Sequence, residues 1–171
     1  MKSVFLFILA SVTMLSVSAQ DDKSKRPSPP ARATQTLETG TVVTIDYSQP
    51  AVKGRAIGKD IEPMEGKVWR TGANEATVFE VSKAVEIDNK TLPAGKYGLF
   101  TIKEGDTWTF IFNKTWKQWG AYNYNAADDV LRIKAKAEKA NDFAERMSLS
   151  IDKDGKVALL WGDSKVGFKV K

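Results

Sequence analysis

The sequence predicts an all-β fold, a single-domain antiparallel β-sandwich, with an open β-barrel as the alternative. From Ala33 onward, short runs alternate apolar and polar residues, which is the period of a strand with one buried face. Turn residues separate these runs at intervals typical of all-β domains. No long segment has the period of an amphipathic helix. The chain of 171 residues has no Cys, so a hydrophobic core and hydrogen bonds must hold this fold without disulfides.

Residues 1–19 are expected to be a signal peptide. Lys2 precedes an apolar run over residues 4–15, and Ala19 ends a segment with small residues at the positions that a signal peptidase recognises. The run is shorter than the roughly 20 residues that span a bilayer, and no later segment is long and apolar enough to do so. No Cys follows it for lipid attachment. We therefore expect an exported chain, periplasmic or secreted, with no transmembrane segment after cleavage.

Residues 20–32 contain three prolines and no apolar period. Such a segment buries too little apolar surface to order itself. The sequence therefore predicts a flexible leader over residues 20–32 and a β-sandwich domain over residues 33–171.

Alternation predicts the strands of this domain in order. The residues expected to share the buried face of a strand are Val43, Ile45 and Tyr47; Thr77, Phe79 and Val81; Leu131, Ile133, Ala135 and Ala137; Met147, Leu149 and Ile151; and Val166, Phe168 and Val170. Residues 98–100 and 107–112 are apolar at nearly every position, so these two runs are expected to form the centre of the fold. Asp154-Gly155 predicts a hairpin turn between two of the strands.

Composition excludes several classes of chemistry. The chain has no His, which removes the usual general base near neutral pH, the commonest zinc ligand and every Ser-His or Cys-His nucleophile pair. No cofactor fingerprint or cluster of metal ligands is present, so we expect neither a cofactor nor a metal. The net charge of +5 falls to +4 when Lys2 is removed with the signal peptide, which is a mild excess. We expect no nucleic-acid partner for an exported chain of this kind.

The first candidate site lies around the Thr71-Gly72 turn. Arg70, Asn74 and Glu75 stand close together in the sequence there, and an Arg fork beside an amide and a carboxylate is suited to sugar hydroxyls or a small anion. In the alternative interpretation Arg70 pairs with Glu75 and Asn74 closes the turn, so that the cluster only holds the loop.

The second candidate site is the polar and aromatic segment over residues 113–124. It supplies Lys114, Trp116, Trp119 and Tyr122, and flat aromatic faces beside amides commonly stack sugar rings or planar ligands. Alternatively, the two Trp side chains fold down as a lid over one end of the core.

Asp128 and Asp129 follow this segment, and with Glu75 they are the acids that could form a catalytic carboxylate pair. Adjacent acids before a strand more often belong to a turn. A carboxylate-dependent, glycosidase-like hydrolase is therefore an alternative and not the first hypothesis.

Several motifs occur in order along nearly the whole mature chain. They are YSQPAVKGR at residues 47–55, VWRTGANEAT at 68–77, LPAGKYGLFTI at 92–102 and WTFIFNK at 108–114. Together they resemble DUF2911, an uncharacterised family of exported Bacteroidota proteins. The resemblance implies an envelope setting and carries no established activity or functional residues.

The preferred hypothesis is a non-catalytic envelope binding module for a glycan or a small anionic or polar ligand. The residues expected to contact the ligand are Arg70, Asn74, Glu75, Lys114, Trp116, Trp119 and Tyr122. Besides the hydrolase, the other alternative is a structural protein that presents a sheet edge to an envelope partner. The hypothesis requires the two candidate segments to lie side by side at one end of the fold.

Overall fold

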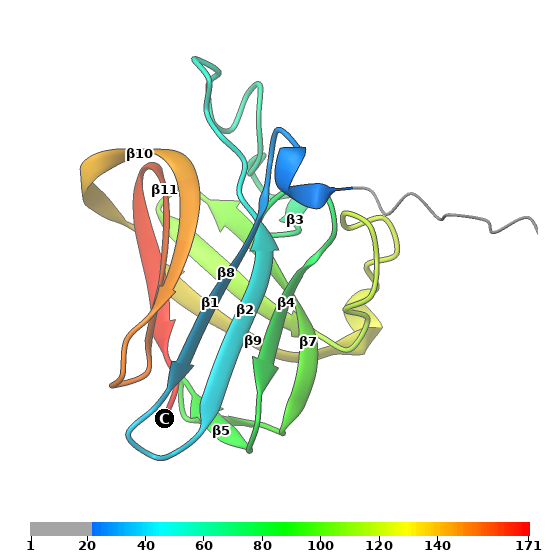
Figure 1. Ribbon diagram of the computed structural model, residues 1–171, viewed down its shortest axis with the longest axis vertical. Helices are drawn as coiled ribbons and strands as arrows, with labels where there is room; N and C mark the ends of the chain where they lie inside the picture. The colour runs from blue at the N-terminus through cyan, green and yellow to red at the C-terminus, as the bar shows by residue number, and fades with distance from the viewer. Residues whose placement is uncertain (1–21) are drawn as a thin grey trace, which may run out of the picture.

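The computed structural model describes residues 22–171, and the expected signal peptide lies outside the described residues (Figure 1). Antiparallel strands make up nearly all of the regular structure. The two helices are single 3₁₀ turns, η1 (Lys23–Lys25) and η2 (Ala126–Asp128). Over residues 22–171 the strands do not close into a barrel, and no helix has the length and apolar character needed to cross a membrane. The predicted all-β antiparallel fold is confirmed.

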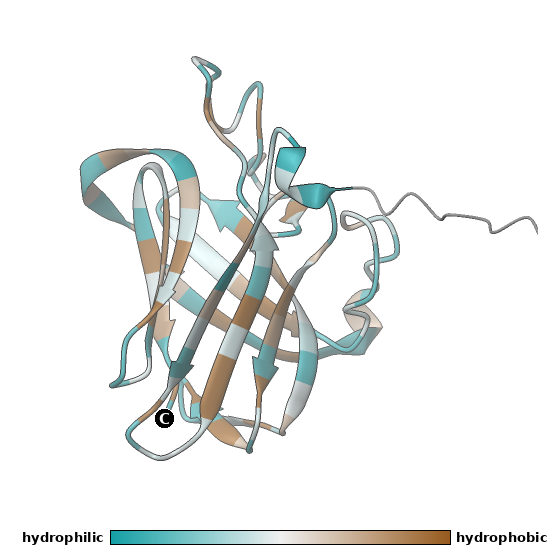
Figure 2. Cartoon of the chain, viewed as in Figure 1, coloured by the Kyte–Doolittle hydropathy of each residue, from teal (hydrophilic) through white to brown (hydrophobic). Residues whose placement is uncertain are grey.

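The larger sheet has seven strands. Its order is β1 (Pro30–Thr36), β2 (Val42–Ser48), β4 (Thr77–Val81), β7 (Gly95–Glu104), β8 (Thr107–Asn113) and β9 (Asp129–Lys136), and β3 (Val68–Trp69) pairs with β7. Every pairing is antiparallel. Two short strands, β5 (Val85–Ile87) and β6 (Lys90–Leu92), form a separate hairpin. In Figure 2, hydrophobic and hydrophilic residues alternate along β2, as a half-buried strand requires.

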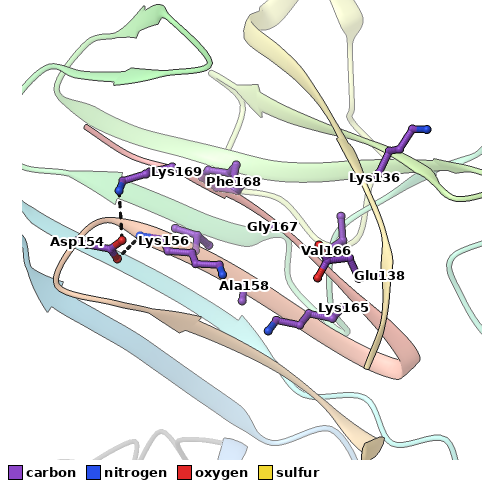
Figure 3. Close-up of a pocket in the computed structure, with 11 residues that line it drawn as sticks. Lys136, Glu138, Asp154, Lys156, Ala158, Lys165, Val166, Gly167, Phe168 and Lys169 are labelled. Carbon is purple, nitrogen blue, oxygen red and sulfur yellow. Dashed lines mark hydrogen bonds and ion pairs between the residues drawn. The ribbon is translucent and has the colours of Figure 1, made fainter. Parts of the chain in front are cut away.

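The last two strands, β10 (Glu138–Ile151) and β11 (Lys156–Lys169), form a second sheet. The predicted turn joins them, and in it the Asp152 N–H donates to the Lys156 carbonyl at 2.8 Å. β11 bends back on itself near Gly162, whose φ is 58°. The Val170 N–H consequently reaches the Gly155 carbonyl at 2.8 Å. Figure 3 shows the two arms of β11 side by side.

The two sheets pack together through aromatic side chains. Phe168 of β11 lies edge-on to three rings of the larger sheet, with centroid distances of 6.0 Å to Phe79, 5.0 Å to Phe110 and 5.5 Å to Phe112. Edge-to-face pairs of this kind stabilise a core by about 1 kcal/mol each beyond the area that they bury. Strand alternation turns Phe168 inward, and its neighbours Gly167 and Lys169 therefore face outward.

The centre of the larger sheet is buried on both faces, as the apolar runs of β7 and β8 predicted. Leu99 and Phe110 face the main core, whereas Phe100 and Ile111 belong to a smaller cluster on the opposite face. The Tyr124 ring covers that cluster, with its centroid 5.1 Å from that of the Phe100 ring and an angle of 62° between the two ring planes. The segment after β8 is thereby fixed across the outer face of the sheet.

The N-terminal segment differs from the expected leader of residues 20–32. Over its described part the chain is bound to the domain, because β1 begins at Pro30 and pairs with β2 from Pro30↔Ser48 onward. Arg32 also forms an ion pair with Asp46 of β2. Low apolar content was a misleading criterion for a flexible leader, because β1 forms a strand from alternating polar and small residues. Its proline, Pro30, did not exclude a strand either, since Pro is tolerated at the first position of a strand.

We predict that Gly167→Ala destabilises the protein by about 3 kcal/mol, because an added Cβ would overlap the Val157 carbonyl oxygen in the other arm of β11. Urea unfolding followed by Trp fluorescence measures this change. Gly105→Ala is the matched control, since its Cβ meets nothing within 4 Å and only the φ of 62° opposes it. That control should cost about 1 kcal/mol. Equal losses in the two variants would contradict the bent arrangement of β11.

Candidate functional site

The two candidate segments lie side by side, as the sequence hypothesis required. One is the β3–β4 loop, residues 70–76, and the other is the aromatic loop, residues 114–125, between β8 and η2. Glu75 and Trp119 form an isolated antiparallel bridge. The Ala76 N–H donates to the Gln118 carbonyl at 3.0 Å, and the Gly120 N–H donates to the Asn74 carbonyl at 2.9 Å. Backbone hydrogen bonds therefore hold the two loops in register.

The β3–β4 loop is held in an unusual conformation by its own polar groups. Thr71 and Asn74 have positive φ values of 52° and 58°. The Thr77 hydroxyl donates to the Thr71 carbonyl at 2.8 Å, and the Asn74 amide donates to the Ser28 carbonyl at 2.9 Å. Asn tolerates the left-handed region better than most residues, which accounts for its presence at this position. The Asn74 side chain therefore anchors the segment before β1.

Glu75 pairs with the N-terminal segment and not with Arg70, so the structure does not contain the Arg70–Glu75 pair of the alternative interpretation. Its carboxylate accepts a hydrogen bond from Lys23 Nζ at 2.9 Å and from Arg26 Nη1 at 3.1 Å. Burial alone would raise the pKa of Glu75, but hydrogen bonds from Lys23, from the Glu75 backbone and from Arg26 outweigh it and lower the pKa to about 2.

Arg70 makes no side-chain hydrogen bond or ion pair with residues 22–171, although it is partly buried. Its Nε is one of two fully buried side-chain nitrogens without a partner in that part of the chain. The other is Nε1 of Trp108, which lies in the core against the Trp69 ring. Arg70 Nη1 lies 3.6 Å from the place where a Cβ on Gly120 would stand, and the Tyr122 ring reaches the same place at 3.4 Å. Arg70 and Tyr122 therefore flank Gly120.

Arg70 also lines a cleft of about 430 Å³, which we call the Arg70 cleft. Its lining includes Arg55, Asp60, Glu62, Trp69, Arg70, Asn74 and Trp161. The other charged side chains there have partners. Arg55 donates to the carbonyls of Ala51 at 2.7 Å and Val52 at 3.1 Å. Asp60 accepts from the Ala56 N–H, and Glu62 accepts from the Met64 N–H. Within this cleft, Arg70 is the charged side chain with its hydrogen-bond donors unused.

The aromatic loop is partly exposed and is not a lid formed by its two Trp side chains. Trp119 is 51% exposed and Tyr122 is 83% exposed. The Arg26 guanidinium lies 6.0 Å from the centre of the Trp119 ring, and Lys96 Nζ lies 5.6 Å from that of Trp116. The loop side chains that pack on the smaller core cluster are Ala121 and Tyr124.

The structure brings together five of the seven predicted residues and leaves two apart. Arg70, Asn74, Glu75, Trp119 and Tyr122 gather where the two loops pair. Lys114 is exposed at the start of the aromatic loop, and Trp116 lies beside Lys96 of β7.

Asp128 and Asp129 belong to a hydrogen-bonded network that supports the aromatic loop. Asp129 accepts from Asn113 at 2.7 Å, from the Tyr124 hydroxyl at 2.8 Å and from Arg132 Nε at 2.7 Å. Burial, followed by the hydrogen bond to Asp129, raises the pKa of Tyr124 to about 12. The Thr115 hydroxyl donates to Asp128 at 3.1 Å. These two carboxylates hold the base of the loop in place.

Sequence reasoning missed the residues that come from distant segments. Lys23 and Arg26 lie in the expected leader, and Arg55 and Trp161 complete the far wall of the Arg70 cleft. Arg55 stands at the end of the YSQPAVKGR motif, which was the one available indication for it.

Comparison with known proteins identifies a family. A family model described as "Protein of unknown function (DUF2911)" matches residues 28–170, so the chain belongs to the DUF2911 family. Searches of the curated proteins and of the solved structures found no match.

The pKa of Glu75 predicts a stability change at acid pH. Because the pKa is lowered from 4.5 to about 2, the ion pairs of Glu75 contribute fully above pH 4.5, and the contribution disappears as the pH falls through 2. The carboxylate is 40% exposed, so solvent screening limits this contribution to about 1 kcal/mol. Urea unfolding from pH 7 to pH 2 should show Glu75→Gln less stable than wild type at pH 7, with the difference vanishing at the acid end. A difference independent of pH would contradict the ion-pair assignment.

Proposed function

We propose that this member of the DUF2911 family is a non-catalytic binding module that takes a small carboxylate-bearing ligand, an acidic sugar in particular, in the Arg70 cleft. The observation that carries the proposal is the partly buried Arg70 guanidinium, whose Nε has no partner on the wall of a cleft of about 430 Å³. Burying a charged donor without a partner is costly. A ligand carboxylate in the cleft would supply an acceptor to the terminal nitrogens of this guanidinium, which make no hydrogen bond or ion pair with residues 22–171 either.

Arg is suited to this role because its planar fork can hold both oxygens of a carboxylate. The volume of the cleft falls within the range of about 300–1,000 Å³ that is usual for small-molecule sites. Trp69 and Trp161 supply apolar lining, and each already donates its indole N–H to a backbone carbonyl, that of Gly72 or Glu62. Their rings therefore need no polar partner from a ligand.

The aromatic loop supports a sugar as the class of ligand. Arg70 and Tyr122 flank Gly120, and Trp119 next to it is half-exposed. A flat aromatic surface beside the guanidinium would stack on the apolar face of a sugar ring whose carboxylate reaches Arg70. The loops are fixed by backbone pairing, so such a site is largely preformed and loses little entropy on binding.

No observation favours the hydrolase alternative. Two cations hold Glu75 as a carboxylate with a pKa of about 2, whereas a general acid must be protonated near the working pH. Asp129 already accepts three side-chain hydrogen bonds that support the loop. The expected signal peptide would place the binding module in the envelope or outside the cell.

We predict that Arg70→Met weakens binding of glucuronate or galacturonate by roughly 10- to 100-fold, the value of a charged hydrogen-bonded pair. Isothermal titration measures this loss, with uncharged glucose as the ligand control. Because Arg70 has no partner within the described chain, its replacement should leave the melting temperature unchanged or slightly higher.

Arg55→Met removes the same charge from the same cleft and is the matched control. Arg55 donates to two backbone carbonyls, so this variant should lose stability while binding falls less than in Arg70→Met. Equal affinity of wild type and Arg70→Met for both acids, or no binding by wild type at millimolar concentrations, would refute the proposal.

A further inference from the structure

We infer that a second surface, a lysine-lined groove across β9 and β11, binds a linear acidic polysaccharide. Two adjoining hollows of about 370 Å³ and 250 Å³ form this basic groove, and they share Gly167, Phe168 and Lys169. The lysines that line it are Lys134, Lys136, Lys156, Lys165, Lys169 and Lys171. The basic groove and the Arg70 cleft have no lining residue in common.

The charge of the basic groove is strongly unbalanced. Three carboxylates, those of Asp88, Glu138 and Asp154, face the six lysines. Asp154 is already paired with Lys169 at 3.2 Å. Lys156 and Lys165 make no side-chain hydrogen bond or ion pair with any residue from 22 to 171. Several ammonium groups along the groove are therefore available to anions from solution.

The shape of the basic groove follows from the bend in β11. In Figure 3 the side chains of Lys156 and Lys165 extend toward one another across Ala158, and Gly167 lies on the arm opposite Ala158. Gly167 can carry no side chain, because the Val157 carbonyl occupies the space of a Cβ. A floor of small residues between long cationic side chains forms a shallow channel, which suits a chain with repeated negative charges.

The lining favours a polysaccharide over a nucleic acid or a membrane. Proteins that bind single strands stack bases on exposed aromatic rings, but the aromatic residue of this groove, Phe168, is only 9% exposed. Surfaces that insert into membranes present large apolar side chains, whereas Ala158 and Gly167 form this floor. Ammonium groups over a small-residue floor match the carboxylates or sulfates of a linear sugar polymer.

The test measures binding of the mature protein to polygalacturonate and to heparin over a range of NaCl concentrations. The double variant Lys156→Gln with Lys165→Gln should bind at least tenfold more weakly than wild type and elute from immobilised heparin at lower salt. Its melting temperature should not change, since both side chains are unpaired in the structure. Uncharged dextran should not bind to either protein.

Lys59→Gln with Lys83→Gln is the matched control, because it removes two exposed charges from outside the basic groove. If this control loses as much affinity for the polysaccharides as the groove variant does, binding depends only on net charge and the proposal is overturned. Absence of polymer binding by wild type would overturn it as well, as would tighter binding to single-stranded DNA or to anionic vesicles than to either polysaccharide. The basic groove and the Arg70 cleft share no lining residue, so the variant Lys156→Gln with Lys165→Gln should bind free glucuronate like wild type. Failure of one proposal is therefore distinguishable from failure of the other.

Discussion

The packing of Phe168 against three rings of the larger sheet is the contact on which the rest of the structure depends. It joins the two sheets in the main core, and it fixes the face that β11 turns inward. Because side chains alternate along a strand, the same contact turns Lys169 and Gly167 outward to the basic groove. Docking of β11 also brings Trp161 opposite Trp69, so the Arg70 cleft has walls from both sheets.

The polar groups around the paired loops differ in how far they are satisfied. Glu75 is neutralised by Lys23 and Arg26, although all three side chains are partly open to solvent. Arg70 is also partly buried, but its Nε is fully buried and has no acceptor within the described chain. The N-terminal segment thus neutralises the Glu75 carboxylate, whereas the partly buried Arg70 guanidinium nearby stays unpaired. The positive charge at Arg70 is therefore not balanced by a neighbouring acid. This unbalanced charge locates the candidate site more precisely than the density of polar and aromatic residues in the sequence does.

Strand alternation was enough to predict most of the fold, because each strand buries one face and the period of that burial is visible in the sequence. β2, β4 and the two central strands, β7 and β8, were found in this way. β1 was missed because an edge strand with Pro at its first position and few apolar residues looks like a linker. The bend of β11 was missed because a single residue, Gly162, interrupts the alternation of apolar and polar residues. The close backbone contact at Gly167 does not change that alternation and so cannot be seen in the sequence.

The candidate site was predictable only in part, for a related reason. The high density of polar and aromatic residues identified both loops. Their pairing at Glu75 and Trp119 agrees with the expectation that the two segments lie side by side. The partners of each side chain could not be inferred, since Lys23 and Trp161 approach from opposite ends of the chain.

The two proposed sites would select their ligands by different physics. Arg70 is partly buried at the wall of its cleft, so its attraction for a carboxylate is screened less by solvent and depends less on salt. Five of the six lysines of the basic groove are exposed to solvent, where a Debye length of about 8 Å at physiological ionic strength screens each charge. Binding there depends on several of them acting together. A single small acid would gain little from such a groove, whereas a polymer contacts many lysines at once. The Arg70 cleft is therefore suited to one carboxylate and the basic groove to a chain of them.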